Sequence, residues 1–391
     1  MIGRKQIVIL GCLLMIGLAG LCGCGSPSSD SMERVGTEAD HAADVPGGLT
    51  YESSMELQYA KNFSVDDYEG GYKILKTMDG TQILVVPEEK EVPDGIGKDV
   101  VVVKRPVKNL YVVSSSIMDI FSKLDAMDTI RLSSQKEEDW YVQDAKDAME
   151  RGDILYAGKY SKPDYELIVS ENCSLAIENT MITHSPEVSE MLADFDIPTM
   201  IEYSSYESHP LGRVEWVKFF GALIGKDELA QKIFNEEVRL VDEVTSVEKT
   251  DKTVAFFYVT SNGLIQVRSS SDYVPKMISL AGGNYIPTNI GDPDSKRSTV
   301  SMQIEDFYDQ AKDADFIIYN SSIDGGIGSV QGLLDKCAVL KDFKAVKEGN
   351  VWCTTNDMYQ QSMSIGYLIH DMHAMLQGKD QDEMTYLFHV E

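Results

Sequence analysis

The sequence predicts an α/β protein made of two Rossmann-like lobes joined by one long helix, with a β-hairpin region ahead of the first lobe. Short apolar strands alternate with helix-like segments along most of the chain, a pattern typical of parallel sheets with helices on both faces. Near the middle, more than 30 residues carry apolar side chains at helical spacing without a proline, which indicates a long connecting helix. About 340 residues follow the N-terminal region. That is more than one ordinary core holds, which favours two lobes.

The N-terminal region has a composition of its own. Arg4 and Lys5 precede an apolar run from residue 7 to residue 19, and small residues follow, which describes a cleavable signal over residues 1–23. The alternative is an uncut N-terminal membrane anchor, but the run is shorter than the roughly 20 residues that cross a bilayer. Residues 24–50 are rich in Ser, Gly, Asp and Ala without apolar periodicity, and we expect them to form a flexible tether.

The end of the signal, Leu21-Cys22-Gly23-Cys24, resembles a lipobox, the motif at which bacterial prolipoproteins are acylated on cysteine and cut just before it. The resemblance implies a diacylglyceryl anchor on Cys24, and two acyl chains suffice for stable attachment to a membrane. We therefore expect a chain that is exported across a bacterial cytoplasmic membrane and held by lipid at the extracytoplasmic face of the cell membrane.

Residues 51–209 are expected to form the N-terminal lobe with its leading hairpin. Asp79-Gly80 lies between two alternating apolar runs, which is a strong signal for a two-residue hairpin turn. Pro186 is expected at the first position of a helix, with Ser185 as its N-cap. The expected strands span 72–77, 81–86, 100–104, 110–113, 129–132, 154–156, 175–178 and 198–203, and the expected helices span 117–124, 140–151, 164–172 and 186–195.

Residues 210–248 are expected to form the linking helix, and residues 249–391 the C-terminal lobe. Gly225 is the one weak point of the link, so a helix pair is the alternative to a single helix. Gly282-Gly283 is expected to end the first helix of the C-terminal lobe. That lobe is expected to contain strands at 254–259, 264–267, 316–319 and 350–354 and helices at 273–280, 304–314, 330–337, 363–376 and 382–389.

Charge and motifs exclude several classes of function. The formal net charge is −28, which predicts a solvated acidic exterior and no nucleic-acid binding. The motifs GxGxxG, P-loop, HExxH and GxSxG do not occur where their chemistry would need them, so we expect neither an enzyme nor a resident cofactor. His370 and His373 have metal-ligand spacing but no third ligand nearby, and a role as surface or hydrogen-bonded helix residues is the blander alternative. A disulfide between Cys337 and Cys353 suits an oxidising compartment and stays open.

Four stretches recur in an order and spacing that point to a known family: Pro163-Asp-Tyr-Glu166 ahead of Leu175-Ala-Ile-Glu178, Ser301-Met-Gln-Ile-Glu305 ahead of Ala314-Asp-Phe-Ile-Ile318, Ala281-Gly-Gly-Asn284, and Phe343-Lys-Ala-Val-Lys-Glu-Gly-Asn-Val-Trp352. Over roughly residues 68–391 the chain thereby resembles the substrate-binding proteins of ABC importers for iron-siderophores, haem and vitamin B12. The resemblance implies a monomeric binding protein that captures a metal chelate as cargo and delivers it to a permease and its ATPase. It also implies that Glu166 and Glu305, one on each lobe, dock onto arginines of the permease. The interval from Glu305 to Asp315 is longer than the family pattern, which makes Glu305 the weaker of the two matches.

Ligands of open α/β sheets bind beyond the carboxyl ends of the strands, which selects the loops after the expected strands. The tyrosines in these loops suit a large planar or macrocyclic ligand, and Arg213 and Arg268 suit an anionic one. Arg213 has pairing with a neighbouring glutamate as its alternative role. The candidate ligand-binding residues are Ser115, Ser116, Asn179, Thr180, Met181, Tyr203, His209 and Arg213 in the first part of the chain, and Asn262, Arg268, Tyr273, Asn320 and Tyr359 in the C-terminal lobe.

Three kinds of cargo stay open: a ferric siderophore comes first, and haem and a cobalamin-like corrinoid follow. Met181 and His184 form a candidate axial pair for haem iron, with core packing and turn capping as their alternative roles. Two other functions also stay open. One is a surface lipoprotein that senses a ligand without transport. The other is an extracytoplasmic enzyme such as a chelate reductase or hydrolase, against which the missing catalytic motifs argue.

Overall fold

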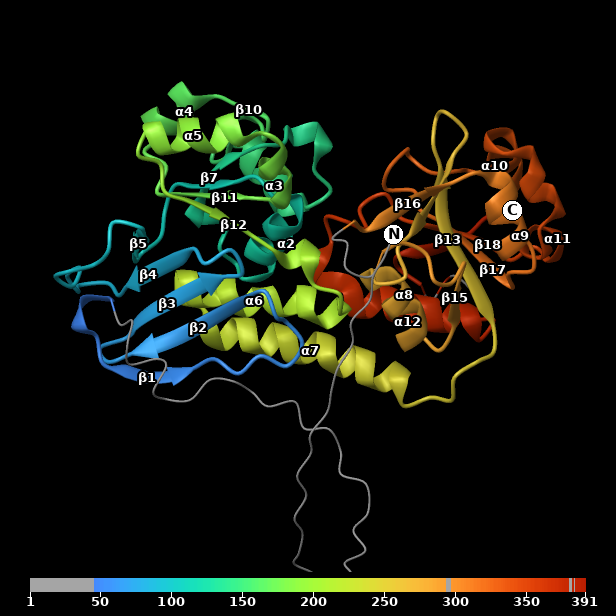
Figure 1. Ribbon diagram of the computed structural model, residues 1–391, viewed down its shortest axis with the longest axis horizontal. Helices are drawn as coiled ribbons and strands as arrows, with labels where there is room; N and C mark the ends of the chain where they lie inside the picture. The colour runs from blue at the N-terminus through green and yellow to red at the C-terminus, as the bar shows by residue number, and fades with distance from the viewer. Residues whose placement is uncertain (1–45, 293–296, 380–381, 383) are drawn as a thin grey trace, which may run out of the picture. The chain divides into compact units, whose positions relative to one another are not determined.

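The computed structural model describes residues 46–292, 297–379, 382 and 384–391. The predicted signal, Cys24 and the predicted tether up to residue 45 lie outside the described residues. Two α/β lobes and a leading sheet belong to one compact unit (Figure 1). Within the described ranges, no helix is both long enough and apolar enough to cross a membrane.

A five-stranded sheet precedes the first lobe, with its strands in chain order. Neighbouring strands are antiparallel except β4 and β5, which are parallel. The predicted Asp79-Gly80 turn is confirmed, because Gly80 has φ +89° and Lys76 pairs with Gln82 across the hairpin. The sequence prediction lacks β1 and β2, since the adjacent aspartates of β2 lower its strand propensity. After the turn η1 (Pro46–Gly48), the strands are β1 (Tyr51–Ser54), β2 (Phe63–Tyr68), β3 (Tyr72–Thr77), β4 (Gln82–Val86) and β5 (Val100–Lys104).

The N-terminal lobe is built on a parallel sheet in the order β12-β11-β6-β7-β8, which confirms the predicted parallel pairing. Alternate residues of a strand face opposite layers: Leu110 and Val112 pack with α2, α3 and α6, and Tyr111 packs with α4 and α5. Ser185 and Pro186 begin α5 as predicted, but the Ser185 side chain makes no capping bond. The elements are β6 (Leu110–Val112), α2 (Ser115–Lys123), β7 (Ile130–Ser133), α3 (Gln143–Glu150), β8 (Leu155–Tyr156), the small hairpin β9 (Gly158–Lys159) and β10 (Lys162–Pro163), α4 (Tyr165–Ser170), β11 (Leu175–Glu178), α5 (Pro186–Asp194) and β12 (Thr199–Ile201).

The predicted link is a helix pair, α6 (Pro210–Ile224) and α7 (Asp227–Thr245), and not one continuous helix. Gly225 adopts the left-handed conformation, with φ 81° and ψ 31°, and this ends α6. The two helices then pack against each other (Figure 1). Gly221 permits their close approach, because a Cβ at this position would lie 2.5 Å from the Cβ of Ala230. Helix α7 also packs on α12 of the C-terminal lobe, so the pair still joins the lobes.

The C-terminal lobe has a mixed sheet of seven strands. Parallel pairs join β13 to β15, β13 to β17 and β17 to β18, while β14, β16 and β19 pair antiparallel. Helices α8 and α12 cover one face, and α9, α10 and α11 cover the other (Figure 1). The elements are β13 (Thr253–Val259), β14 (Ile265–Arg268), α8 (Tyr273–Leu280), β15 (Asn284–Ile286), β16 (Thr299–Met302), α9 (Ile304–Ala311), β17 (Phe316–Tyr319), α10 (Val330–Lys336), α11 (Lys344–Glu348), β18 (Val351–Thr354), α12 (Ile365–Leu376) and β19 (Leu387–His389).

The predicted closing helix over 382–389 is wrong, because Leu387–His389 forms strand β19. This strand pairs antiparallel with β18, with Trp352 opposite His389. A carboxylate from another helix also fixes the segment, since Asp371 Oδ2 on α12 accepts backbone N–H groups of the approach to β19. A long-range pairing has therefore overridden the local helical pattern.

Candidate functional site

The carboxyl ends of β6, β7, β8 and β11 surround a cavity of about 290 Å³ in the N-terminal lobe, which we call the strand-end cavity. Its volume is close to the lower end of the usual range for small-molecule sites. The wall combines two lysines, two tyrosines, two serines and two amide side chains with a single carboxylate, a set suited to an anionic ligand with flat apolar parts. The lining residues are Val113, Ser115, Ser134, Gln135, Lys136, Asp139, Tyr156, Lys159, Tyr160 and Asn179.

The sequence prediction includes Ser115 and Asn179 of this wall but lacks the residues after β7 and β8. Ligands of open α/β sheets bind beyond the carboxyl ends of the strands, and this strand-end rule holds for β7 and β8 as well. Applied to the loops after these two strands, the rule selects Lys136 and Lys159. Lys136 forms an exposed ion pair with Glu138 at 3.3 Å. Lys159 makes no ion pair within the part of the chain that the structure describes, and its ammonium group is therefore available to a ligand.

Met181 and His184 both belong to the short 3-10 helix η4 (Thr180–His184), which follows β11, and both side chains are exposed. Side chains three residues apart eclipse one another on a 3-10 helix, so these two project to the same side. Axial ligands reach a haem iron from opposite faces of the porphyrin. The geometry therefore does not support these two residues as an axial pair. Thr180 lies on the same turn, which Asn179 caps by accepting the Met181 N–H at 2.9 Å.

Two other candidate residues line none of the cavities described in this section. Tyr203 is buried and hydrogen-bonds Asp79 of the leading sheet, and burial together with the nearby carboxylate raises the pKa of Tyr203 to about 12. Asn262 is exposed in the turn between β13 and β14, where its Oδ1 accepts the hydroxyl of Thr260 at 2.5 Å. Tyr203 therefore holds the leading sheet against the lobe, and Asn262 closes a hairpin.

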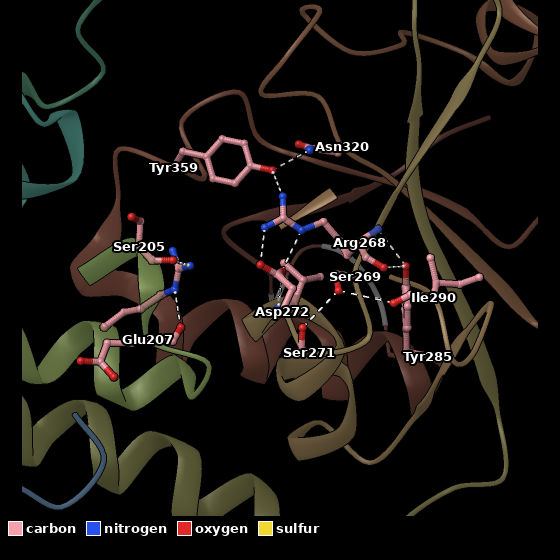
Figure 2. Close-up of polar contacts among 12 residues, drawn as sticks. Ser205, Glu207, Arg268, Ser269, Ser271, Asp272, Tyr285, Ile290, Asn320 and Tyr359 are labelled. Atoms are coloured by element: carbon pink, nitrogen blue, oxygen red, sulfur yellow. Dashed lines mark hydrogen bonds and ion pairs between the residues drawn. The ribbon is translucent and has the colours of Figure 1, made fainter. Parts of the chain in front are cut away.

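Arg268, a candidate for binding an anion, is held inside the C-terminal lobe (Figure 2). Its Nε and Nη2 donate to the two carboxylate oxygens of Asp272 at 2.8 and 2.7 Å. Its Nη1 donates to the Tyr359 hydroxyl at 3.2 Å, and the Asn320 amide donates to the same hydroxyl at 2.8 Å. Arg268 is only 6% exposed, so this bidentate pair fixes α8 and the loop after β18 to the sheet.

Arg213, the second candidate arginine, is also committed to internal contacts. Its guanidinium carbon lies 3.6 Å from the centroid of the Tyr273 ring, and it donates to the backbone oxygens of Ser205 and Glu207. The two side chains line a small cavity of about 50 Å³ with Ser116 and Tyr359. This volume is far below that of a siderophore or haem site. Ser116, Arg213, Tyr273 and Tyr359 are thus brought together, but as a packed contact between the lobes.

A loop of the C-terminal lobe crosses to the N-terminal lobe, and we call this contact the lobe seam. The Gln360 side chain accepts the Tyr141 N–H and donates to the Asp139 carbonyl, both at 2.8 Å. In the next turn, η7 (Ser362–Ser364), the Ser362 hydroxyl donates to the Ser116 carbonyl at 2.6 Å. Polar bonds of this kind limit the motion of one lobe against the other.

Two buried carboxylates hold the beginning of α12 at the lobe seam. Asp119 Oδ2 on α2 accepts the Met363 N–H, and Glu237 Oε2 on α7 accepts the Gly366 N–H, both at 2.7 Å. Burial is the main cause that raises the pKa of Asp119 to about 6 and that of Glu237 to about 7. The seam therefore contains groups that titrate near neutral pH.

Metal and disulfide chemistry has no counterpart in the described part of the chain. No three His, Cys, Asp or Glu side chains gather there in a way that could hold a metal ion. His373 Nδ1 lies 2.9 Å from the Ala281 carbonyl, which agrees with the blander role given to that histidine. Cys337 and Cys353 are free thiols, so the disulfide left open by the sequence does not form in this structure.

Comparisons with known proteins show which fold the chain has. No family model matches the chain. The chain is 23% identical over 378 residues to an uncharacterized lipoprotein of Methanocaldococcus jannaschii. The matched residues cover 91% of this chain and 89% of the relative. The periplasmic haem-binding protein HutB of Vibrio cholerae has a TM-score of 0.55 at 13% identity, covering 67% of this chain and 97% of that one. An ABC transporter substrate-binding protein from Listeria monocytogenes has a TM-score of 0.51 at 17% identity, covering 69% and 98%.

These solved structures confirm the predicted two-lobed α/β class. The chain has the fold of the periplasmic solute-binding proteins, and the resemblance drawn from its four sequence stretches is confirmed at the level of the fold.

Proposed function

We propose that the chain is an extracytoplasmic solute-binding lipoprotein that captures an anionic metal chelate, a ferric siderophore first, and delivers it to an ABC importer. The observation that carries the proposal is the strand-end cavity, which lies where open α/β sheets bind ligands and presents Lys136 and Lys159 beside Tyr156 and Tyr160. The fold shared with solute-binding proteins supports binding without turnover. The lipoprotein relative supports the lipid anchor expected on Cys24.

The wall of the strand-end cavity explains how such a cargo is held. The ammonium groups of Lys136 and Lys159 offset the negative charge that ionised catecholate or carboxylate arms give to a ferric chelate. The rings of Tyr156 and Tyr160 offer flat apolar faces, and their hydroxyls keep hydrogen-bonding capacity. The lobe seam restricts lobe rotation, so we expect capture with little hinge motion.

The cargo is tested by titrating the purified lipoprotein with a ferric catecholate siderophore, a ferric hydroxamate siderophore, haemin and cobalamin. We expect the anionic ferric catecholate to bind most tightly, seen as a rise in melting temperature and a shift of its charge-transfer band. If haemin or cobalamin binds more tightly, that compound replaces the ferric siderophore as the proposed cargo. If none of the four binds, the chelate proposal fails.

Lys159→Gln is expected to weaken binding of the ferric catecholate about tenfold or more, because one charge-assisted contact is lost. Lys162→Gln is the matched control, since Lys162 pairs with Lys159 in the same small hairpin but does not line the cavity. The dissociation constants come from isothermal titration calorimetry. Equal affinities of the two variants would remove Lys159 from the site.

Docking to the permease is expected to use Glu166 and Glu305. Both are exposed and lie in the first turns of α4 and α9, one on each lobe. Glu166→Lys with Glu305→Lys is expected to reduce uptake in cells about tenfold or more while leaving chelate affinity unchanged, because charge reversal converts attraction to arginines into repulsion. Glu187→Lys, exposed on α5, is the control. Unchanged uptake of the double variant would exclude this docking mode.

A further inference from the structure

A second cavity, of about 570 Å³, opens between the two halves of the chain, and we call it the basic cavity. It shares no lining residue with the strand-end cavity. Its volume lies within the roughly 300–1,000 Å³ typical of small-molecule sites. The lining residues are Gln58, Tyr59, Lys61, Ser208 and His209 from the N-terminal half, and Ser270, Ser271, Asp272, Pro275, Lys276 and Ser279 from the C-terminal lobe.

The wall of the basic cavity presents hydrogen-bond donors. His209 Nδ1 accepts the Leu211 N–H at 3.2 Å, so the neutral ring carries its proton on Nε2 as a donor. The ring is fixed by stacking on Tyr59, with centroids 4.5 Å apart. The Ser270 oxygen accepts the Ile290 N–H at 2.8 Å, which leaves the Ser270 O–H free to donate. Hydroxyl and imidazole donors that face one cavity suit an oxyanion.

Lys61 and Lys276 add positive charge from the two sides of the basic cavity. Neither lysine forms an ion pair within the described ranges, although the whole chain carries a net charge of −28. Both lie close enough to His209 to act on it: burial first, and then the charges of Lys276 and Lys61, lower the pKa of His209 to about 4. The ring is therefore neutral at pH 7, and among the described residues neither ammonium group forms an ion pair with a carboxylate.

The one carboxylate in the wall is already neutralised. Asp272 receives two hydrogen bonds from Arg268, at 2.8 and 2.7 Å, and its Oδ1 also accepts the Val274 N–H at 3.0 Å (Figure 2). Its charge is therefore directed into the C-terminal lobe and offset there. Among the described lining residues, Lys61 and Lys276 are then the charged groups without an ion-pair partner.

We infer that the basic cavity is a binding site for a small multivalent oxyanion, such as a polycarboxylate or a phosphate, distinct from the strand-end cavity. Lys61 and His209 would hold the anion from one half of the chain, and Lys276 and Ser270 from the other. An anion bound between the halves favours the arrangement in which both sides reach it, and so it stabilises the closed contact of the lobes.

The test uses citrate and inorganic phosphate as probes, added to the purified lipoprotein at constant ionic strength set with chloride. We expect citrate to raise the melting temperature and to bind in calorimetry, with a weaker effect of phosphate. Each of Lys61→Gln and Lys276→Gln should weaken citrate binding about tenfold, and the double variant about a hundredfold. Resonances of the His209 ring should shift on saturation with citrate in the parent protein.

Lys232→Gln, on the exposed face of α7, is the matched control and should bind citrate as the parent does. Both test lysines are exposed, so the variants should melt at the parent temperature without citrate. No citrate binding by the parent would overturn the inference, and so would equal binding by the double variant and the control. Binding of the ferric chelate at the strand-end cavity is measured in parallel, so the two sites can fail separately.

Discussion

Glu215→Ala is expected to lower the free energy of unfolding by about 3–5 kcal/mol, the usual cost of removing one partner from a buried ion pair. Glu215 on α6 is fully buried, and its carboxylate accepts the backbone N–H groups of Gln58, Tyr59 and Ala60 at 2.8–3.1 Å. Its Oε1 also lies 2.9 Å from the ammonium group of Lys218, which is 3% exposed. Truncation would leave a buried cation and three backbone donors without their acceptor, of which that of Ala60 is buried.

Urea denaturation followed by circular dichroism measures the free energy of unfolding. The control Glu190→Ala, on the exposed face of α5, should change the free energy of unfolding by less than about 0.5 kcal/mol. The double variant Glu215→Leu with Lys218→Met separates the two contributions. It removes the unpaired cation but leaves the N–H groups of segment 58–60 unsatisfied, so we expect it to recover only part of the stability. Full recovery would show that the backbone contacts contribute nothing, and unchanged stability of Glu215→Ala would contradict the whole account.

Glu178→Met is expected to remove a loss of stability that the parent protein shows as the pH rises from about 5 to about 9. Glu178 is the last residue of β11, is fully buried, and has no hydrogen-bond partner for either carboxylate oxygen among the described residues. Strand alternation places it on the same face as Ala176, in the apolar layer under α4 and α5. Burial raises the pKa of Glu178 from its ordinary 4.5 to about 8.

The sign follows from proton linkage. The folded state binds the proton of Glu178 more strongly than the unfolded state does, so the contribution of this group is most favourable below about pH 4.5. This contribution to stability declines as the pH rises towards about 8 and stays constant above that pH. The total stability lost is on the order of 3–5 kcal/mol. Methionine has a similar length to glutamate and no charge. The variant should therefore be as stable as the parent at pH 5 and more stable than the parent at pH 9.

The check is a series of urea midpoints between pH 5 and pH 9 for the parent, Glu178→Met and the exposed control Glu187→Met. The parent and the control should share one profile. Asp119 and Glu237 also have raised pKa values, so some slope remains in every protein, and the difference between profiles reports Glu178. Parallel profiles of the parent and Glu178→Met would refute the buried, neutral state of this carboxyl group.

Much of the candidate site follows from the strand pattern. The strand at 175–178 and the helix at 273–280 have in the structure the bounds expected from the sequence. The strand-end rule then places Ser115 and Asn179 at a real cavity. The rule finds positions because parallel strands must present their carboxyl ends on one edge. It does not state which side chains at that edge are free.

Availability is decided by the partners that each side chain meets in the folded chain. Arg213 and Arg268 have the charge for binding an anion, but Tyr273, Asp272 and Tyr359 already engage them. Lys159 has the same charge and no such partner among the residues that the structure describes. The partners of Arg268 range from Asp272, four residues away, to Tyr359, 91 residues away, and a local pattern can contain only the nearer one.

By itself the sequence determined the α/β class, the two lobes, the Asp79-Gly80 turn and the order of most elements, because these depend on periodicity and on local backbone preference. The tertiary structure alone decided that Leu387–His389 pairs as a strand and that the lobe link breaks at Gly225 into a packed pair. It alone also decided that Lys159 lines one cavity and that Lys61 and Lys276 line another. Those features arise from long-range hydrogen bonds, helix packing and burial. They depend on which residues meet in space and not on which residues adjoin in the chain.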